Sequence, residues 1–165
     1  MRIAADVELY NFTAYNTFIL EASNRIPPWQ PPPKCDRSLT RFAKRDTSNV
    51  VLQQEFESLR ESFGSHMEFY TDGSRTNTGV SCAMVTETTT RSHCIKKIMS
   101  IFSAEVYAVI LALNYILQNQ VKSSVIYTDS LSCVHAITSL HTSKNFLVQR
   151  AQYIASKIIN KGYSL

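Results

Sequence analysis

Two kinds of hydrophobic pattern follow one another along this chain, and the change falls near residue 66. Ahead of it, residues 49–62 place four apolar side chains on one helical face, which predicts an amphipathic helix: Val51, Leu52, Phe56 and Leu59. After residue 66, short apolar runs rich in β-branched and aromatic residues predict strands over 67–71, 79–86 and 92–99. Because these strands are joined by short connections, we expect an antiparallel meander.

The remainder of the chain alternates helices with one more strand. The strand is predicted over 124–128, and the helices over 104–119, through residue 140 and over 146–160. Side chains suited to cap these helices precede them in order: Ser103, Asp129 or Ser130, and Asn145. The first of these caps would place Glu105 in the first turn of its helix. Residues 163–165 begin a further element.

The N-terminal part is organised differently. All five prolines lie between residues 26 and 33, which predicts a stiff extended linker, although such segments can also be ligands for aromatic-lined grooves. A short helix is possible over 10–22. The run Lys34–Arg45 carries five basic residues, for which a solvated face is the ordinary interpretation and phosphate contact the secondary one. We therefore expect an extension over 1–66 and a folded domain over 67–165.

Composition limits the class of protein. With 165 residues, 44% of them hydrophobic, the chain suits one compact domain with an extension. The longest apolar run, 106–113, is too short to span a bilayer, and charges interrupt the first eight residues where a secretory signal needs an apolar stretch. We expect no membrane association and an intracellular location, in the cytoplasm or nucleus. The four widely spaced cysteines indicate neither a zinc site nor a disulfide scaffold.

Charge is unevenly distributed. The net charge of +4 comes entirely from residues 67–165, where nine Lys and Arg outnumber five Asp and Glu, whereas residues 1–66 hold eight of each. A basic domain is compatible with a phosphate-bearing partner. The few acids that this domain retains are therefore of interest.

Three of those acids could converge. Asp72 and Asp129 each follow a predicted strand, and Glu105 lies on the helix between those strands. Adjacent strand ends and a crossover helix packed on the same sheet can bring such side chains to one point. Crowded carboxylates favour a divalent cation, and oxygen ligands favour Mg²⁺ or Mn²⁺ over zinc. The alternative is purely structural, with the two aspartates as turn or cap residues and Glu105 stabilised by the helix dipole.

The strings around these acids resemble the first three motifs of type 1 ribonuclease H, in the same order: FYTDGS at 69–74, FSAEVYA at 102–108 and IYTDS at 126–130. Their wording is most similar to ribonuclease H domains of non-long-terminal-repeat retrotransposons, which follow a reverse transcriptase. The resemblance covers residues 67–165. It implies an α/β fold with a mixed sheet, in which a three-strand antiparallel meander is followed by a crossover helix, a fourth strand and further helices.

The resemblance also implies a function. Asp72, Glu105 and Asp129 would be the catalytic, metal-binding acids of an endonuclease that cleaves the RNA strand of RNA–DNA hybrids. Two Mg²⁺ or Mn²⁺ ions would serve a complete site, and Asn77 would contact the minor groove of the hybrid. A reverse transcriptase domain in the same polyprotein would be a partner.

One feature of the family is missing. Such domains add a last strand, a loop with a histidine, and a helix with a fourth carboxylate, whereas no acid follows Asp129 here. The alternative is therefore an inactive, truncated fragment that binds nucleic acid weakly. A haloacid-dehalogenase-type phosphatase is disfavoured, because its nucleophilic aspartate would stand at position 70, which is Tyr.

Overall fold

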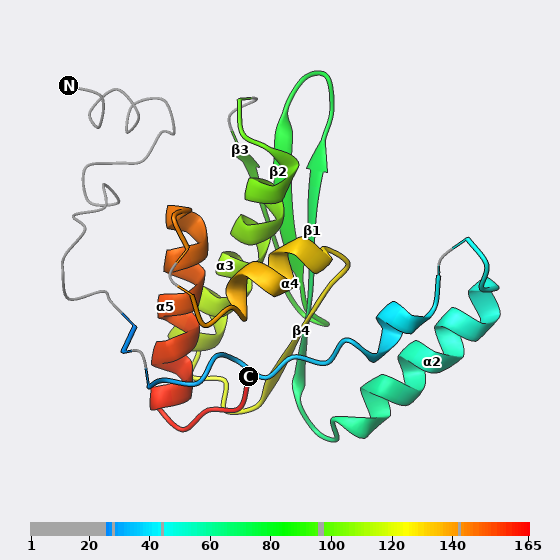
Figure 1. The fold of residues 1–165 in the computed structure, drawn as a ribbon, viewed down its shortest axis with the longest axis horizontal. Coiled ribbons are helices and arrows are strands. Elements are labelled where there is room, and N and C mark those ends of the chain that lie inside the picture. Colours follow the sequence, from blue (N-terminus) through cyan, green and yellow to red (C-terminus); the bar gives the residue numbers. More distant parts are fainter. Residues whose placement is uncertain (1–25, 28, 44, 96–97, 142) are drawn as a thin grey trace.

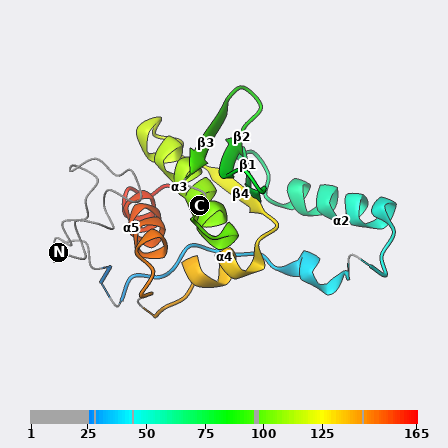
Figure 2. The same ribbon diagram turned by 90° about the horizontal axis from the view of Figure 1, so that it is seen from above.

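The computed structural model describes residues 26–165 except 28, 44, 96–97 and 142, so the helix expected over 10–22 lies outside the described residues. A four-stranded sheet carries helices on both sides (Figures 1 and 2). In chain order the elements are η2 (Ser38–Arg41), α2 (Asn49–Ser62), β1 (Met67–Arg75), β2 (Val80–Val85), β3 (Thr90–Ile95), α3 (Ile101–Gln118), β4 (Ser124–Thr128), α4 (Leu131–Ile137) and α5 (Phe146–Asn160).

The sheet has the order β3-β2-β1-β4, which confirms the predicted mixed topology. Strands β1, β2 and β3 form the antiparallel meander. Strand β4 then pairs in parallel with β1, from Met67 opposite Ser124 to Thr71 opposite Thr128. Since a parallel pair needs a crossover connection, α3 must pass over the sheet between β3 and β4. The fold class expected from the sequence is thus confirmed.

Strand β1 is longer than predicted. The expected end at Thr71, with a turn over Asp72–Ser74, is wrong, because β1 continues to Arg75. Its parallel pairing with β4 does stop at Thr71, but its antiparallel pairing with β2 runs from Tyr70 to Arg75. Asp72 therefore lies inside the strand, one residue beyond the end of the parallel ladder.

Helix α3 begins one turn earlier than expected. Its N-cap is Ser100, whose side chain accepts a hydrogen bond from the backbone N–H of Ser103, so the assignment of the cap to Ser103 is wrong. Both serines are chemically suitable, and the one that starts the helix leaves Ile101 and Phe102 helical. Glu105 consequently lies in the second turn, where the helix dipole gives it little stabilisation.

Helix α3 also forms the centre of the hydrophobic core. Ten of its residues are buried, and it packs on β1 and β2 on one side and on α5 on the other (Figure 2). By length and composition alone α3 could cross a membrane. Burial of 56% of its length inside this fold accounts for that apolar composition.

The remaining elements agree with the sequence to different degrees. The bounds predicted for α2, β4 and α5 are confirmed, and Ser130 rather than Asp129 caps α4. Helix α4 ends at Ile137 rather than Leu140, which lies 78% exposed. Strand β3 covers Thr90–Ile95 instead of 92–99, because a tight turn closed by the Thr86 and Thr89 backbones starts it early. Near the C-terminus, Ser164 makes an isolated parallel bridge with Ser123, beside the start of β4.

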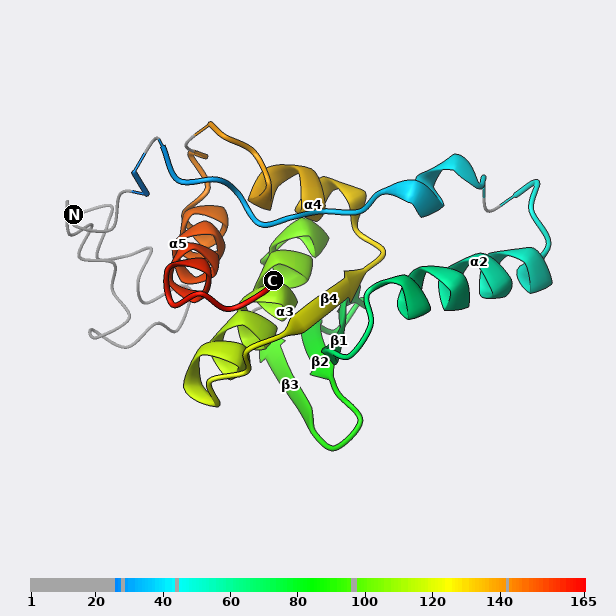
Figure 3. The same ribbon diagram turned by 90° about the horizontal axis from the view of Figure 1, so that it is seen from below.

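The sheet face opposite α3 is partly covered by α2 (Figures 2 and 3). Along β1, Phe69 faces α3 and contacts the ring of Tyr115, whereas Tyr70 points the other way. The Phe56 ring of α2 lies 5.2 Å from Tyr127 and 6.5 Å from Tyr70. The domain boundary between residues 66 and 67 stays a prediction, but these contacts attach the preceding helix to the sheet.

A charged network strengthens the same attachment. Arg60 of α2 donates two hydrogen bonds of 2.8 Å to the Glu68 carboxylate of β1, which also accepts one from the Tyr70 hydroxyl. The Arg60 hydrogen bonds hold the pKa of Glu68 below its ordinary value. Burial, and then the hydrogen bond to Glu68, raise the pKa of Tyr70 to about 12. Helix α2 and β1 are therefore joined by a bidentate ion pair beside the aromatic contact.

This network makes a testable prediction about stability. Glu68→Gln should lower the free energy of unfolding near neutral pH by roughly 1 kcal/mol, after a discount for partial exposure of the pair. A carboxylate with a lowered folded-state pKa stabilises above its unfolded-state pKa, and this stabilisation disappears as pH falls through the folded-state value. Denaturant unfolding at a series of pH values should show the gap between wild type and variant closing in acid.

Glu57→Gln is the matched control. Glu57 also bonds Arg60, but its side chain is 49% exposed, so its loss should change stability by no more than about 0.5 kcal/mol. Equal losses for the two variants, or a gap that persists in acid, would contradict the role given to Glu68.

Candidate metal centre

Three carboxylates from three elements meet at one end of the sheet. Asp72 comes from β1, Glu105 from the second turn of α3, and Asp129 from the residue after β4. One ligand oxygen from each lies within 4.8 Å of the others, which confirms the predicted convergence. Among the described residues this is the one group of three or more His, Cys, Asp and Glu side chains so closely placed.

Gly73 makes the convergence possible. A Cβ atom at this position would lie 2.7 Å from the Glu105 backbone nitrogen and 3.0 Å from the Ala104 carbonyl carbon. Real Cβ atoms essentially never show a contact as short as 2.7 Å, and both neighbours are backbone atoms of α3 that no side-chain rotation can move. Glycine therefore allows α3 to lie directly against β1 beside Asp72. Its role is this close approach and not the turn that the sequence predicted.

The end of β4 is held in place by polar contacts. The Thr71 hydroxyl donates to the Tyr127 carbonyl across the parallel pair, at 3.1 Å. One residue before Asp129, the Thr128 hydroxyl accepts from the Ser130 backbone N–H, and Ser130 in turn caps α4. Asp129 is thus placed by ordered backbone on both sides.

The three acids differ in exposure. Glu105 is only 8% exposed, whereas Asp72 and Asp129 lie at the surface. Burial, followed by the charges of Asp129 and Asp72, raises the pKa of Glu105, and a hydrogen bond from the Gly73 backbone opposes that rise. Like charges held this close disfavour full ionisation without a cation.

The side chains fit a divalent metal ion. The Glu105 Oε2 atom is buried and has no hydrogen-bond partner in the described structure, which is costly for a carboxylate oxygen unless something else coordinates it. Every donor at the cluster is a carboxylate oxygen, the ligand type that Mg²⁺ and Mn²⁺ prefer. The nearby Cys133 thiol does not compete, because burial raises its pKa to about 12 and keeps it protonated.

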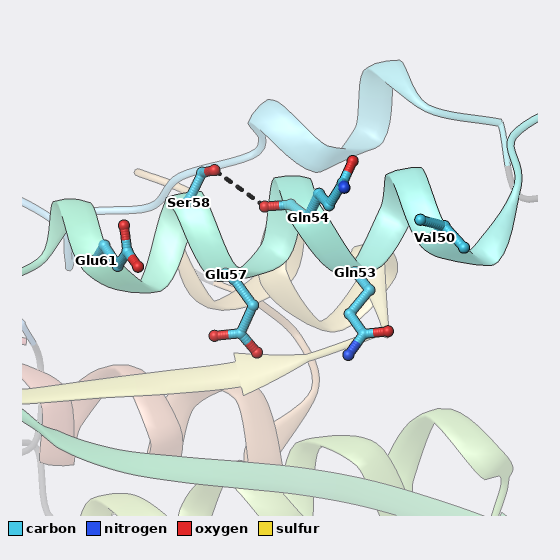
Figure 4. Close-up of a pocket in the computed structure, with 6 residues that line it drawn as sticks. All are labelled: Val50, Gln53, Gln54, Glu57, Ser58 and Glu61. Carbon is cyan, nitrogen blue, oxygen red and sulfur yellow. Dashed lines mark hydrogen bonds between the residues drawn. The ribbon is translucent and has the colours of Figure 1, made fainter.

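Other candidate residues lie apart from the cluster. Asn77 is exposed in the turn between β1 and β2. A hollow of about 430 Å³ on the outer side of α2 is lined by the six residues drawn in Figure 4. Glu57 in this hollow is already paired with Arg60, and the hollow has no convergent group of ligands. Sequence reasoning found the three acids but missed the roles of Gly73 and Thr71, because both depend on neighbours distant in sequence.

The chain is similar to known proteins in sequence and in structure. The family model described as RNase H matches residues 64–163. Among solved structures, RNase H1 from the halophilic archaeon Halobacterium salinarum aligns with 16% identity and a TM-score of 0.44, over 58% of this chain and 78% of that one. The N-terminal RNase H domain of a Mycobacterium tuberculosis protein, solved as a fusion with maltose-binding protein, aligns with 18% identity and a TM-score of 0.44, over 55% and 79%. No curated protein matches the chain.

Gly73→Ala should destabilise the fold by about 1–3 kcal/mol, because the added methyl group forces α3 away from β1. Gly79→Ala is the control, since a Cβ there would meet nothing within 4 Å. Urea unfolding of both variants measures the difference. Equal stability of the two variants would show that α3 does not lie against β1 as described.

The raised pKa of Glu105 predicts how stability depends on pH without metal. A group whose folded-state pKa is raised stabilises below its unfolded-state pKa of about 4.5, and that contribution is lost as pH rises through the folded-state value. In EDTA, the free energy of unfolding of wild type should therefore fall over this range relative to Glu105→Gln. Added Mg²⁺ should restore wild-type stability, by about 1.4 kcal/mol at ten times its dissociation constant.

The control for this experiment is Glu87→Gln, which removes an exposed acid from the turn between β2 and β3. This variant should keep both the wild-type pH dependence and the response to Mg²⁺. If Glu105→Gln were stabilised by Mg²⁺ as strongly as wild type, the cluster would not be the binding site.

Proposed function

The chain belongs to the RNase H family, and from that premise we propose that it hydrolyses the RNA strand of RNA–DNA hybrids with Asp72, Glu105 and Asp129 as its catalytic acids. The observation that carries the proposal is the convergence of three carboxylates, with one oxygen of each within 4.8 Å of the others, at a site where the buried Glu105 Oε2 atom has no hydrogen-bond partner in the described structure. Membership of the family does not by itself show that this site can catalyse hydrolysis. The fit of the three carboxylates to a divalent cation is the further support for the proposal.

The chain's own residues supply rigidity and access. Close contact of α3 with β1 at Gly73, and the cap that Ser130 gives α4, fix the three carboxylates before substrate arrives. The exposed pair, Asp72 and Asp129, would meet the substrate, while Glu105 would hold the ion from the buried side. When bound, Mg²⁺ or Mn²⁺ would activate water and stabilise charge on the phosphate oxygens.

Selection of the hybrid would rest on shape. Proteins distinguish RNA from DNA through groove geometry and the 2′-hydroxyl group, so no base-reading motif is expected. Asn77 is exposed where it could reach the minor groove of a bound hybrid, and we retain it as a proposed contact. The substrate contacts therefore extend along the sheet from Asp72 toward the β1–β2 turn.

The amino-acid sequences of the motifs suggest a more specific class of ribonuclease H. The strings at 69–74, 102–108 and 126–130 are most similar to retrotransposon domains, so we propose a domain that acts beside a reverse transcriptase, in the cytoplasm or nucleus. Hybrids arise wherever DNA is copied from RNA, which gives such a nuclease its substrate. Co-expression with a reverse transcriptase module would test the association.

Hybrid cleavage tests the proposed activity directly. With Mg²⁺, the chain should cleave the labelled RNA strand of a hybrid and leave duplex RNA, duplex DNA and single-stranded RNA intact. Asp72→Asn and Asp129→Asn should each lower the rate by at least about 100-fold, since loss of a ligand disturbs the metal more than loss of an outer partner does.

Glu87→Gln, purified in parallel, controls for contaminating nucleases and should cleave like wild type. Residual cleavage that is equal in all preparations would be contamination and would contradict the proposal. Hybrid binding without cleavage by wild type, in Mg²⁺ and in Mn²⁺, would instead identify the inactive binding fragment.

A further inference from the structure

A segment ahead of the sheet lies along a groove that also reaches two of the three carboxylates. We call residues 30–42 the strap. It runs from the end of α5, past β4 and α4, to η2, which lies alongside α2 (Figures 1 and 3). The strap and the two exposed aspartates, Asp72 and Asp129, line one continuous groove of about 920 Å³.

Both ends of the strap are anchored. At one end, the Gln30 side chain donates to the Ser156 carbonyl at 3.0 Å and to the Asn160 side chain at 3.1 Å, both on α5. At the other end, Arg41 forms an ion pair of 3.0 Å with Glu55 of α2. The segment forms the short 3₁₀ helix η2 at its second anchor, over Ser38–Arg41. The strap is therefore held across the groove.

The strap turns its apolar side chains inward and its cations outward. Pro33, Leu39 and Phe42 are half-buried along the groove, whereas Lys34 and Arg37 are exposed. Within the described residues, neither of these two cations forms an ion pair with a carboxylate. Their charges are thus available to a ligand that lies in or over the groove.

Charge is concentrated in this part of the chain. Residues 34–45 hold five basic residues and one acid, a local charge of +4 that equals the net charge of the whole chain. Acidic residues elsewhere in residues 1–66 cancel this positive charge, so the net charge of that part is zero. The composition alone therefore did not reveal the basic segment. Such a segment attracts polyanions over distances of about a Debye length.

We propose that the strap is a second nucleic-acid contact, in which Lys34 and Arg37 bind backbone phosphates of the hybrid whose RNA strand lies at Asp72 and Asp129. This inference rests on the proposed function, and it adds residues outside the part matched by the family. The carboxylates repel phosphates, so neighbouring cations on the same groove offset that repulsion and hold the duplex in place. Phosphate contacts fix register without reading sequence.

The test measures hybrid binding in a background that cannot cleave. Fluorescence anisotropy with a labelled hybrid would compare Glu105→Gln alone with Glu105→Gln carrying Lys34→Ala and Arg37→Ala. We expect the strap variant to bind at least about tenfold more weakly at low salt, and the slope of log affinity against log salt to fall by nearly 2, one for each lost contact. Lys34→Arg with Arg37→Lys should restore both, because charge is preserved.

The matched control removes the same charge elsewhere. Lys122 and Lys161 are exposed and lie by the start of β4, at the end of the strand away from Asp129. Lys122→Ala with Lys161→Ala should leave the salt slope unchanged. Thermal unfolding of all variants should agree, so that a binding change cannot be attributed to unfolding.

Three results would overturn the inference. Equal losses from the two pairs would show an effect of net charge alone, and unchanged binding in the strap variant would show that the strap does not touch the hybrid, with the proposed function intact. If Glu105→Gln and wild type in EDTA both failed to bind any hybrid, the proposed function itself would fail, and the strap's role with it.

Discussion

The candidate site depends on one constraint, the contact of helix α3 with strand β1 at Gly73. A side chain there would overlap the backbone of Ala104 and Glu105, so only glycine lets the crossover helix descend to the strand. That descent buries Glu105 beside Asp72, and the parallel pairing of β1 with β4 brings Asp129 to the same end. The hydrophobic core and the carboxylate cluster are therefore two consequences of the same packing.

The packing also carries an electrostatic cost. Three carboxylates held close together, one of them buried with an unpaired oxygen, destabilise the folded state when all are charged. Natural folds tolerate such strain where it serves function. A divalent cation would offset the repulsion among the carboxylates and would coordinate the unsatisfied Glu105 oxygen. The crowding of acids that weakens the metal-free fold would therefore favour ion binding. Binding of such an ion would therefore be coupled to stability through Glu105.

Local signals predicted much of this fold. Helices α2 and α5 and strand β4 have the expected bounds, because each combines a clear periodicity with an adjacent cap or turn. The errors fall where partners distant in sequence decide. Strand β1 extends past Asp72 because β2 pairs with it, and Ser100 rather than Ser103 starts α3 although both are good caps. The three acids were predicted by their order and motif, whereas the purpose of Gly73 needed the position of α3.

The N-terminal segment shows the limit of sequence patterns most clearly. The prolines predicted a stiff linker and the basic run a solvated face. Lys34 and Arg37 are exposed, but the segment is also anchored on α5 and α2 and shares a groove with the aspartates. Helix α2 is likewise attached to the second face of the sheet through Phe56 and the Arg60–Glu68 pair. The Gln30–Ser156 contact joins residues 126 positions apart, and Phe56 meets Tyr127 from another element, so neither contact could be read from local sequence. A nuclease site with repulsive acids needs cations to retain a polyanion, and in this fold the segment ahead of the family domain is placed to provide them.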